Sequence, residues 1–261
     1  MIENSLFVLL IVITGLAGFY AKSLSITGAL AAVVVGVFVY LGFGAQGLFL
    51  LGVFFASSSF WSKYKAATKK KLEEKLAKGS IRDWRQVLAN GGTAAATGIV
   101  YSFTHQPLWL LAFAVSIASA NSDTWASEIG SLSRKNPIDI RSFKRVDRGT
   151  SGAVSLLGSM AALFGSFLIA SVSFMLFSFD LHSALLVFIF GYFGNIIDTV
   201  LGAFVQQNFL CTICALKTEK KHHCQHPTLQ IKGLAFFDND MVNFLSGLIA
   251  VILAIGVQQM L

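Results

Sequence analysis

The sequence predicts an all-α, polytopic membrane protein with about eight transmembrane helices and basic cytoplasmic loops. Its mean hydropathy is +0.69, and only 13% of its residues are charged, whereas soluble domains carry about 25%. Apolar stretches of about 18 residues or more, long enough to cross a bilayer, recur along the chain. All 20 lysines and arginines fall in a few segments between those stretches.

The expected spans follow the apolar stretches in order. They are 4–21, 25–42, 44–60, 88–104, 107–129, 150–178, 182–207 and 236–260. No basic residue precedes the first span, and it has no small-residue cleavage pattern, so we expect a retained helix rather than a signal peptide. Only LGFGAQG separates the second span from the third, and only THQP separates the fourth from the fifth. Seven or nine spans are therefore the alternatives.

The basic residues predict the orientation of the chain. Lys22 follows the first span, and the others lie in 63–85, 134–148 and 217–232, each after an odd-numbered span. Because positively charged loops stay in the cytoplasm, we expect a cell-membrane protein with both termini outside and three long loops inside. This distribution explains the net charge of +7 without nucleic-acid binding.

We expect one integral-membrane domain over 1–261, with two cytoplasmic insertions. The first is a basic helix or loop at 61–87, and the second is a Cys/His loop at 209–232. We interpret the first as a solvated, charged face near anionic lipid headgroups. The alternative is that Arg82 or Arg85, close to the fourth span, contacts a substrate.

Carboxylates at the end of the fifth span are the first functional signal. In ASANSDTWASEIG, residues 118–130, Asp123 and Glu128 form one polar flank with Thr124 and Ser127, because residues four apart share a helix face. An ionised residue in the middle of a spanning helix costs about 2.5–3.5 kcal/mol, so such residues are usually functional.

Other spans repeat this pattern on the same predicted side of the membrane. Asn195 and Asp198 are three residues apart in the seventh span, as are Asp240 and Asn243 in the eighth, and Asn90 opens the fourth. We therefore expect one polar pocket facing the cytosol. The alternative is that Asn, Ser, Thr and Gly only join helices through hydrogen bonds and close approach.

Asp123, Glu128 and Asp198 have no basic residue in their own helices, which suggests that an added cation balances them. Mg²⁺ prefers oxygen ligands and is commonly held by one or two carboxylates plus substrate phosphates. The three acids are therefore candidate magnesium ligands.

The segment KRVDRGTSGAVS, residues 144–155, is the candidate phosphate site. It leads into the sixth span, and a helix N-terminus offers free N–H groups to anions. No G-x-x-x-x-G-K-[ST] motif occurs, so it is not a standard P-loop, and a plain helix cap is the alternative. The candidate residues are Lys144, Arg148, Gly149, Thr150, Ser151 and Gly152.

All three cysteines fall in CTICALKTEKKHHC, residues 211–224. Disulfides are disfavoured in the cytoplasm, and three thiols with nearby imidazoles suit tetrahedral Zn²⁺. We expect Cys211, Cys214 and Cys224 as ligands, with the fourth taken from His222, His223 or His226. The alternative is a flexible loop with incidental thiols; a redox motif is disfavoured because no βαβ pattern surrounds it.

Six motifs spread over nearly the whole chain resemble one family. They are LANGG, SDTWASEIG, RGTSGAVS, GNIIDTVLGAFVQ, CTICALKTEKKHHC and DNDMVNFLSG. They resemble the integral-membrane family labelled domain of unknown function 92, to which the plant phytyl-phosphate kinase belongs; Thr199 stands where many relatives have serine. The resemblance implies a membrane-embedded kinase that converts an isoprenoid (phytyl or prenyl) monophosphate to the diphosphate. The implied kinase would use Mg²⁺ and a nucleoside triphosphate, which is ATP, CTP or GTP.

Under this resemblance each cluster has a role. Asp123, Glu128 and Asp198 hold Mg²⁺ or activate the acceptor, and the basic Gly-rich segment from Lys144 to Gly152 holds nucleotide phosphates. Asn90, Asn195, Asp240 and Asn243 complete the pocket, and apolar helices hold the prenyl tail of the membrane lipid substrate.

Two other function classes compete with the kinase. A transporter of an ion or anionic metabolite also carries intramembrane carboxylates and Gly-interrupted helices, and 88–104 is such a helix. A scaffold would use the basic loops to bind partners. The one-sided polar clusters favour the enzyme over the transporter, and the buried acids disfavour the scaffold.

Overall fold

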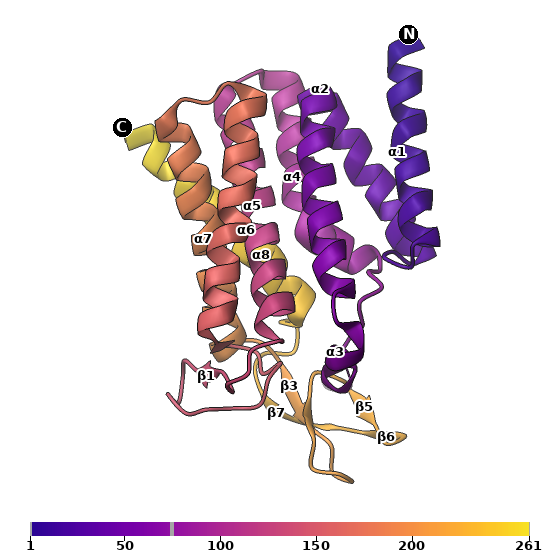
Figure 1. Ribbon diagram of the computed structural model, residues 1–261, viewed down its shortest axis with the longest axis vertical. Helices are drawn as coiled ribbons and strands as arrows, with labels where there is room; N and C mark the ends of the chain where they lie inside the picture. Colours follow the sequence, from indigo (N-terminus) through magenta and orange to yellow (C-terminus); the bar gives the residue numbers. More distant parts are fainter. Residues whose placement is uncertain (1, 74–75, 261) are drawn as a thin grey trace.

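The computed structural model describes residues 2–73 and 76–260, so residues 74 and 75 of the basic loop lie outside the described residues. The chain folds into a bundle of helices (Figure 1). The helices are α1 (Ile2–Tyr20), α2 (Ile26–Lys63), α3 (Ala66–Glu73), α4 (Trp84–Thr104), α5 (Pro107–Gly130), α6 (Leu156–Phe177), α7 (Leu181–Phe204) and α8 (Asn239–Met260).

The second and third expected spans form the two halves of α2. Gly44 interrupts the helix with φ 61° and ψ −152°, a conformation that glycine adopts far more readily than other residues. Both ends of α2 then meet Arg82: the Ser25 N–H donates to its carbonyl at 3.0 Å, and its Nη1 donates to Ser59 Oγ at 3.2 Å. The two halves therefore form an antiparallel hairpin.

The described helices support the membrane class, while the number of spans stays a prediction. Within the described residues, α2, α6, α7 and α8 are long and apolar enough to cross a bilayer, and α1 has a shorter apolar part, Ser5–Tyr20. When the halves of α2 are counted separately, the long helices alternate in direction, and both termini lie at one end of the bundle (Figure 1).

The centre of the bundle is α5, which packs against α2, α4, α6, α7 and α8. Its residues from Leu111 to Ser122 are all buried. A Cβ atom at Gly194 of α7 would lie 1.9 Å from Ser119 Oγ of α5, so only glycine permits this close approach. Asp123 and Asp198 each lie one turn beyond this contact, on helices that run in the same direction (Figure 1). The contact therefore sets these two acids side by side.

Short antiparallel strands in the loops depart from the all-α prediction. β1 (Ile138–Asp139) pairs with β2 (Ala153–Val154), and β5 (His222–His223) pairs with β6 (His226–Pro227). A third sheet has the order β4-β3-β7; its strands are β3 (Asn208–Leu210), β4 (Lys217–Thr218) and β7 (Leu229–Lys232). Figure 1 shows α3 and the strands at the end of the bundle opposite both termini.

The sixth helix begins later than predicted. The expected span starts at 150, whereas α6 starts at Leu156, and Ser155 caps it by accepting a hydrogen bond from the Gly158 N–H at 3.1 Å. The intervening β2 pairs with β1, which takes these residues out of the helix.

The one-sided gathering of loops predicts the outcome of cysteine labelling. Ala67 on α3 and Gln106 in the turn between α4 and α5 are both exposed and lie at opposite ends of the bundle. We expect an impermeant maleimide to label Gln106→Cys in intact cells, and Ala67→Cys only after permeabilisation, because the positively charged end is predicted to face the cytoplasm. The wild-type chain, with its own cysteines, gives the background. Labelling of Ala67→Cys from outside would overturn the orientation.

Candidate functional site

A polar cavity of about 350 Å³ lies at the strand-bearing end of the bundle, among α4, α5, α7, α8 and the loops. Most residues predicted to form the functional pocket line it. They are Asn90, Asp123, Glu128, Arg148, Gly149, Thr150, Ser151, Gly152, Asn195, Asp198, Asp240 and Asn243. Lys144 does not line it: the residue is exposed, and its carbonyl accepts a hydrogen bond from the Asp139 N–H in the preceding hairpin.

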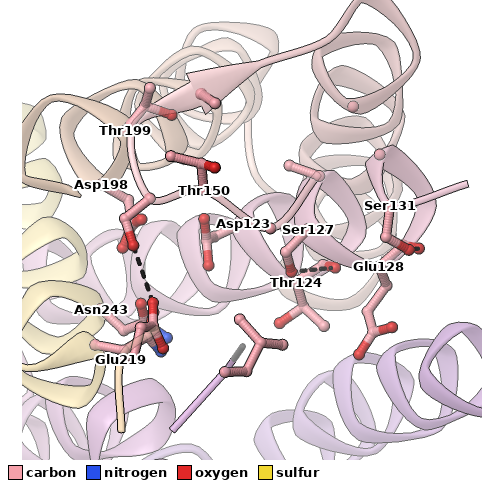
Figure 2. A pocket seen from close by; sticks show the side chains of 18 of the residues that line it. Asp123, Thr124, Ser127, Glu128, Ser131, Thr150, Asp198, Thr199, Glu219 and Asn243 are labelled. Carbon is pink, nitrogen blue, oxygen red and sulfur yellow. Dashed lines mark hydrogen bonds between the residues drawn. The ribbon is translucent and has the colours of Figure 1, made fainter. Parts of the chain in front are cut away.

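Asp123 and Asp198 lie together and are held by neutral donors. Asn195 Nδ2 donates to Asp123 Oδ1 at 3.1 Å, and Ser246 Oγ donates to Asp198 Oδ2 at 3.4 Å. When the Asn243 amide is oriented to satisfy both of its polar atoms, its nitrogen donates to the same Asp198 oxygen at 2.9 Å. Among the described side chains, neither acid forms an ion pair with Lys or Arg. Figure 2 shows both directed into the same space.

Glu128 differs from these two acids because it has a basic partner. Lys69 Nζ of α3 lies 2.6 Å from Glu128 Oε2, and Ser62 Oγ donates to Glu128 Oε1 at 2.7 Å. Glu128 also lies apart from Asp198 in the cavity (Figure 2). The argument from an absent counter-ion therefore fails for Glu128. Lys69 is only 7% exposed, so the solvated-face interpretation of residues 61–87 is wrong for this lysine.

Asp240 also has a basic partner, which ties the loop before α4 to the start of α8. Lys78 Nζ lies 2.5 Å from Asp240 Oδ2 and 2.8 Å from Asp83 Oδ2. Arg85 Nη2 lies 2.6 Å from Asp238 Oδ2, on the exposed side of the same junction. These pairs give Asp240 and Arg85 positioning roles and leave Lys78 as a cation in the cavity lining.

The Gly-rich turn reaches the cavity together with the start of α6, whose N-cap Ser155 and first-turn residues Gly158 and Ser159 also line it. Gly149 and Gly152 have φ values of 75° and 81°, which glycine adopts at no steric cost. A Cβ atom at Gly152 would lie 2.3 Å from Ala203 Cα, so the turn packs directly on α7. Arg148 beside this turn also lines the cavity, so the predicted phosphate-binding residues other than Lys144 are gathered there.

Glu219 is a cavity residue that the sequence did not single out. Its carboxylate accepts hydrogen bonds from Gln206 Nε2 at 2.8 Å, Ser151 Oγ at 2.9 Å and the Ala77 N–H at 3.3 Å. It therefore joins the loop before α4, the Gly-rich turn and the end of α7. Burial raises the pKa of Glu219, and the three donors oppose that shift. Nothing in the surrounding TEKK predicts these contacts.

The cysteine loop brings four ligand atoms together outside the cavity. One ligand atom from each of Cys211, Cys214, His223 and Cys224 lies within 4.8 Å of the others. His222, the neighbouring candidate, is not in the group. Within the described part of the chain, no other Asp, Glu, Cys or His residues form such a group of three or more. Asp123, Glu128 and Asp198 therefore do not form a preassembled metal site.

An apolar cavity of about 320 Å³ adjoins the polar one, between α1, both halves of α2 and α4. Its walls are mainly aliphatic and aromatic, and Leu51, Phe54 and Phe55 are examples. Arg82, Gln86 and Asn90 line both cavities. The two spaces therefore share a wall that begins in the membrane region and ends among the polar groups.

Comparisons with known proteins agree with this membrane architecture. The family described as integral membrane protein DUF92 matches residues 9–251. Protein PGR of Arabidopsis thaliana is 31% identical over 86% of this chain and 85% of that protein. An uncharacterized membrane protein of Methanocaldococcus jannaschii is 33% identical over 77% and 84%. The chloroplastic protein VTE6 of Arabidopsis thaliana is 28% identical over 90% and 66%. No solved structure matches the chain.

The pair of Lys69 and Glu128 generates a stability prediction. Lys69→Met leaves the Glu128 carboxylate in a partly buried place without its cation, at a cost of about 1–3 kcal/mol of unfolding free energy. We expect a lower thermal unfolding midpoint in detergent, and partial recovery when Glu128→Gln is added. Lys65→Met, at an exposed site in the same loop, is the control. Equal midpoints for Lys69→Met and Lys65→Met would contradict the structural role of the pair.

Proposed function

This chain belongs to the DUF92 integral membrane family, and on that premise we propose that it is a membrane-embedded kinase. It would use Mg²⁺ and a nucleoside triphosphate to convert an isoprenoid monophosphate to the diphosphate, the activity that the family resemblance implies. The observation that carries the proposal is the wall shared by the apolar and polar cavities. An acceptor with a hydrocarbon tail and a phosphate head needs this pair of environments.

The acceptor would lie across the shared wall. Its tail would fill the apolar cavity, where burial of hydrocarbon is favourable, and its phosphate would meet Arg82. The Arg82 guanidinium is held by Ser59 Oγ and Ser62 Oγ, each at 3.2 Å, and its planar donors match phosphate oxygens. Burial lowers the pKa of Arg82, opposed by nearby Glu128, but a guanidinium stays charged in proteins.

The donor side of the cavity offers cations and a tight turn. Arg148, Lys78 and the backbone of Gly149–Gly152 line it and would hold the nucleotide phosphates. Asp123 and Asp198 suit Mg²⁺, since this ion takes one or two carboxylates plus substrate phosphates and needs no preassembled cage. The bound ion would neutralise charge on the phosphates. The γ-phosphoryl group would pass to an acceptor phosphate oxygen, and the nucleoside diphosphate would leave; such transfer needs mainly positioning and charge stabilisation.

The far half of the bundle favours an enzyme over the alternative transporter. Phe43 stacks on Phe113 with ring centroids 4.3 Å apart, and it also contacts Tyr101 at 5.0 Å. Phe113 contacts Phe177 at 6.2 Å. These rings fill the core near the end that carries the termini. A transporter needs a pathway that opens at this end in turn, whereas an enzyme whose site opens only at the strand-bearing end does not. The packed rings therefore favour the enzyme.

Phosphoryl transfer should depend on Asp123 and Asp198. We expect purified wild-type protein with Mg²⁺, labelled nucleoside triphosphates and a panel of prenyl monophosphates to form prenyl diphosphate. Asp123→Asn and Asp198→Asn should each lower the rate by about 100-fold or more, as when one preorganised charge-stabilising group is removed. Their thermal midpoints should stay near that of the wild type, because the amide keeps the size of the side chain.

Asp139→Asn is the matched control, because Asp139 lies in β1 and does not line the cavity. Its activity should equal that of the wild type. Full activity in both Asp123→Asn and Asp198→Asn would refute their proposed role. Absence of diphosphate with every nucleotide and acceptor, from folded wild-type protein, would refute the kinase.

The apolar cavity should control the length of the acceptor tail. Gly52 lines this cavity, and a Cβ atom there would meet nothing within 4 Å, so Gly52→Leu can fill the space without a clash at its base. We expect KM to rise for long prenyl monophosphates and to change little for short ones. Gly256→Leu, at a helical glycine that is also open but does not line the cavity, should change neither. An equal change of KM for all tail lengths in Gly52→Leu would contradict binding of the tail in this cavity.

A further inference from the structure

We propose that Cys211, Cys214, His223 and Cys224 bind one Zn²⁺ ion, and that this ion fixes the loop that carries Glu219 into the polar cavity. The inference does not rest on the proposed kinase activity, because it concerns how the cavity is built. It assigns the fourth ligand, which the sequence left open among three histidines.

The ligand geometry fits zinc. Tetrahedral Zn²⁺, with bonds of about 2.3 Å to sulfur and about 2.0 Å to nitrogen, holds its ligand atoms about 3.5–3.8 Å apart. His223 Nδ1 lies 3.4 Å from Cys214 Sγ and 3.2 Å from Cys224 Sγ, and the group as a whole lies within 4.8 Å. The cysteines are free rather than disulfide-bonded. Small shifts of these sulfur and nitrogen atoms therefore suffice to give the tetrahedral spacing.

The backbone around the site is shaped to bring these atoms together. The Ala215 N–H donates to the Cys211 carbonyl and the Cys211 N–H donates to the Leu216 carbonyl, both at 2.9 Å. This tight turn sets the first two thiols side by side. The β5–β6 hairpin supplies the other two ligands, with Cys224 in its turn at φ 51°. In the same hairpin His222 is exposed and stands outside the group.

The ion would therefore close a loop whose middle enters the cavity. Between Cys214 and His223 the chain forms β4, which pairs with β3, and then reaches Glu219. Glu219 accepts hydrogen bonds from Ser151 and Gln206 and from the Ala77 N–H. A cross-link that shortens the free loop lowers the entropic cost of holding Glu219 in place. Loss of the ion should loosen the junction of the three segments that meet at Glu219.

Metal analysis of the purified full-length protein tests the ligand assignment. We expect one zinc per chain in the wild type, and less than half of that in Cys214→Ser, Cys224→Ser and His223→Gln. His222→Gln, the change at the adjacent histidine, should keep its zinc. Folded wild-type protein that neither contains zinc nor binds added Zn²⁺ would overturn the site. Equal zinc loss in His222→Gln and His223→Gln would overturn the assignment of His223.

A second measurement on the wild type tests the coupling, even where variants fail to fold. We expect a zinc chelator to speed tryptic cleavage at Lys217, Lys220 and Lys221, mapped by mass spectrometry, and added Zn²⁺ to reverse this. Glu219→Gln should keep the zinc but cleave faster than the wild type. If chelation removes zinc without changing cleavage, or if Glu219→Gln is cleaved like the wild type, the proposal that the ion fixes the loop carrying Glu219 is overturned. Neither readout depends on phosphoryl transfer.

Discussion

The close approach of α5 and α7 is the constraint on which the site depends. Gly194 lets the two backbones meet at Ser119, and Asp123 and Asp198 follow one turn later on each helix. The same central helix is fixed on its other side through the buried Asn121, which accepts a hydrogen bond from Ser57 and donates one to the Gly165 carbonyl. Two acids are costly to hold together in a low-dielectric region. The packing of small residues around α5 is what holds them there.

The loops then divide the charges of the cavity. Lys69 pairs with Glu128 and Lys78 pairs with Asp240, so these acids gain partners that the spanning helices do not supply. Removing one partner of such a pair is costly, because an uncompensated charge remains. Asp123 and Asp198 are left with neutral donors, which is the state expected of groups that serve a ligand. This division separates positioning acids from the two that the proposed reaction uses.

Local patterns predicted the helices and most of the cavity, and long-range contacts explain what they missed. Apolar stretches located every long helix to within a few residues, except the start of α6, where β2 pairs with β1 instead. Polar residues three or four apart located the acids. The partners Lys69 and Glu219 lie 59 and 68 residues from Glu128 and Ser151, so no helical spacing could reveal them. The choice of His223 over His222 likewise depends on a hairpin, not on the order of residues.

The position of the apolar cavity beside α1 has a kinetic consequence. α1 packs mainly on α2, and its residues Phe7, Leu10 and Ile11 form an outer wall of that cavity. A lipid that enters past this wall would stay within the bilayer throughout its encounter with the enzyme. Its supply would be two-dimensional, set by its mole fraction among the surrounding lipids, while the nucleotide would arrive by ordinary diffusion through water. Dilution of the membrane with inert lipid would then slow the proposed reaction at constant total substrate, whereas dilution with buffer at a fixed nucleotide concentration would not.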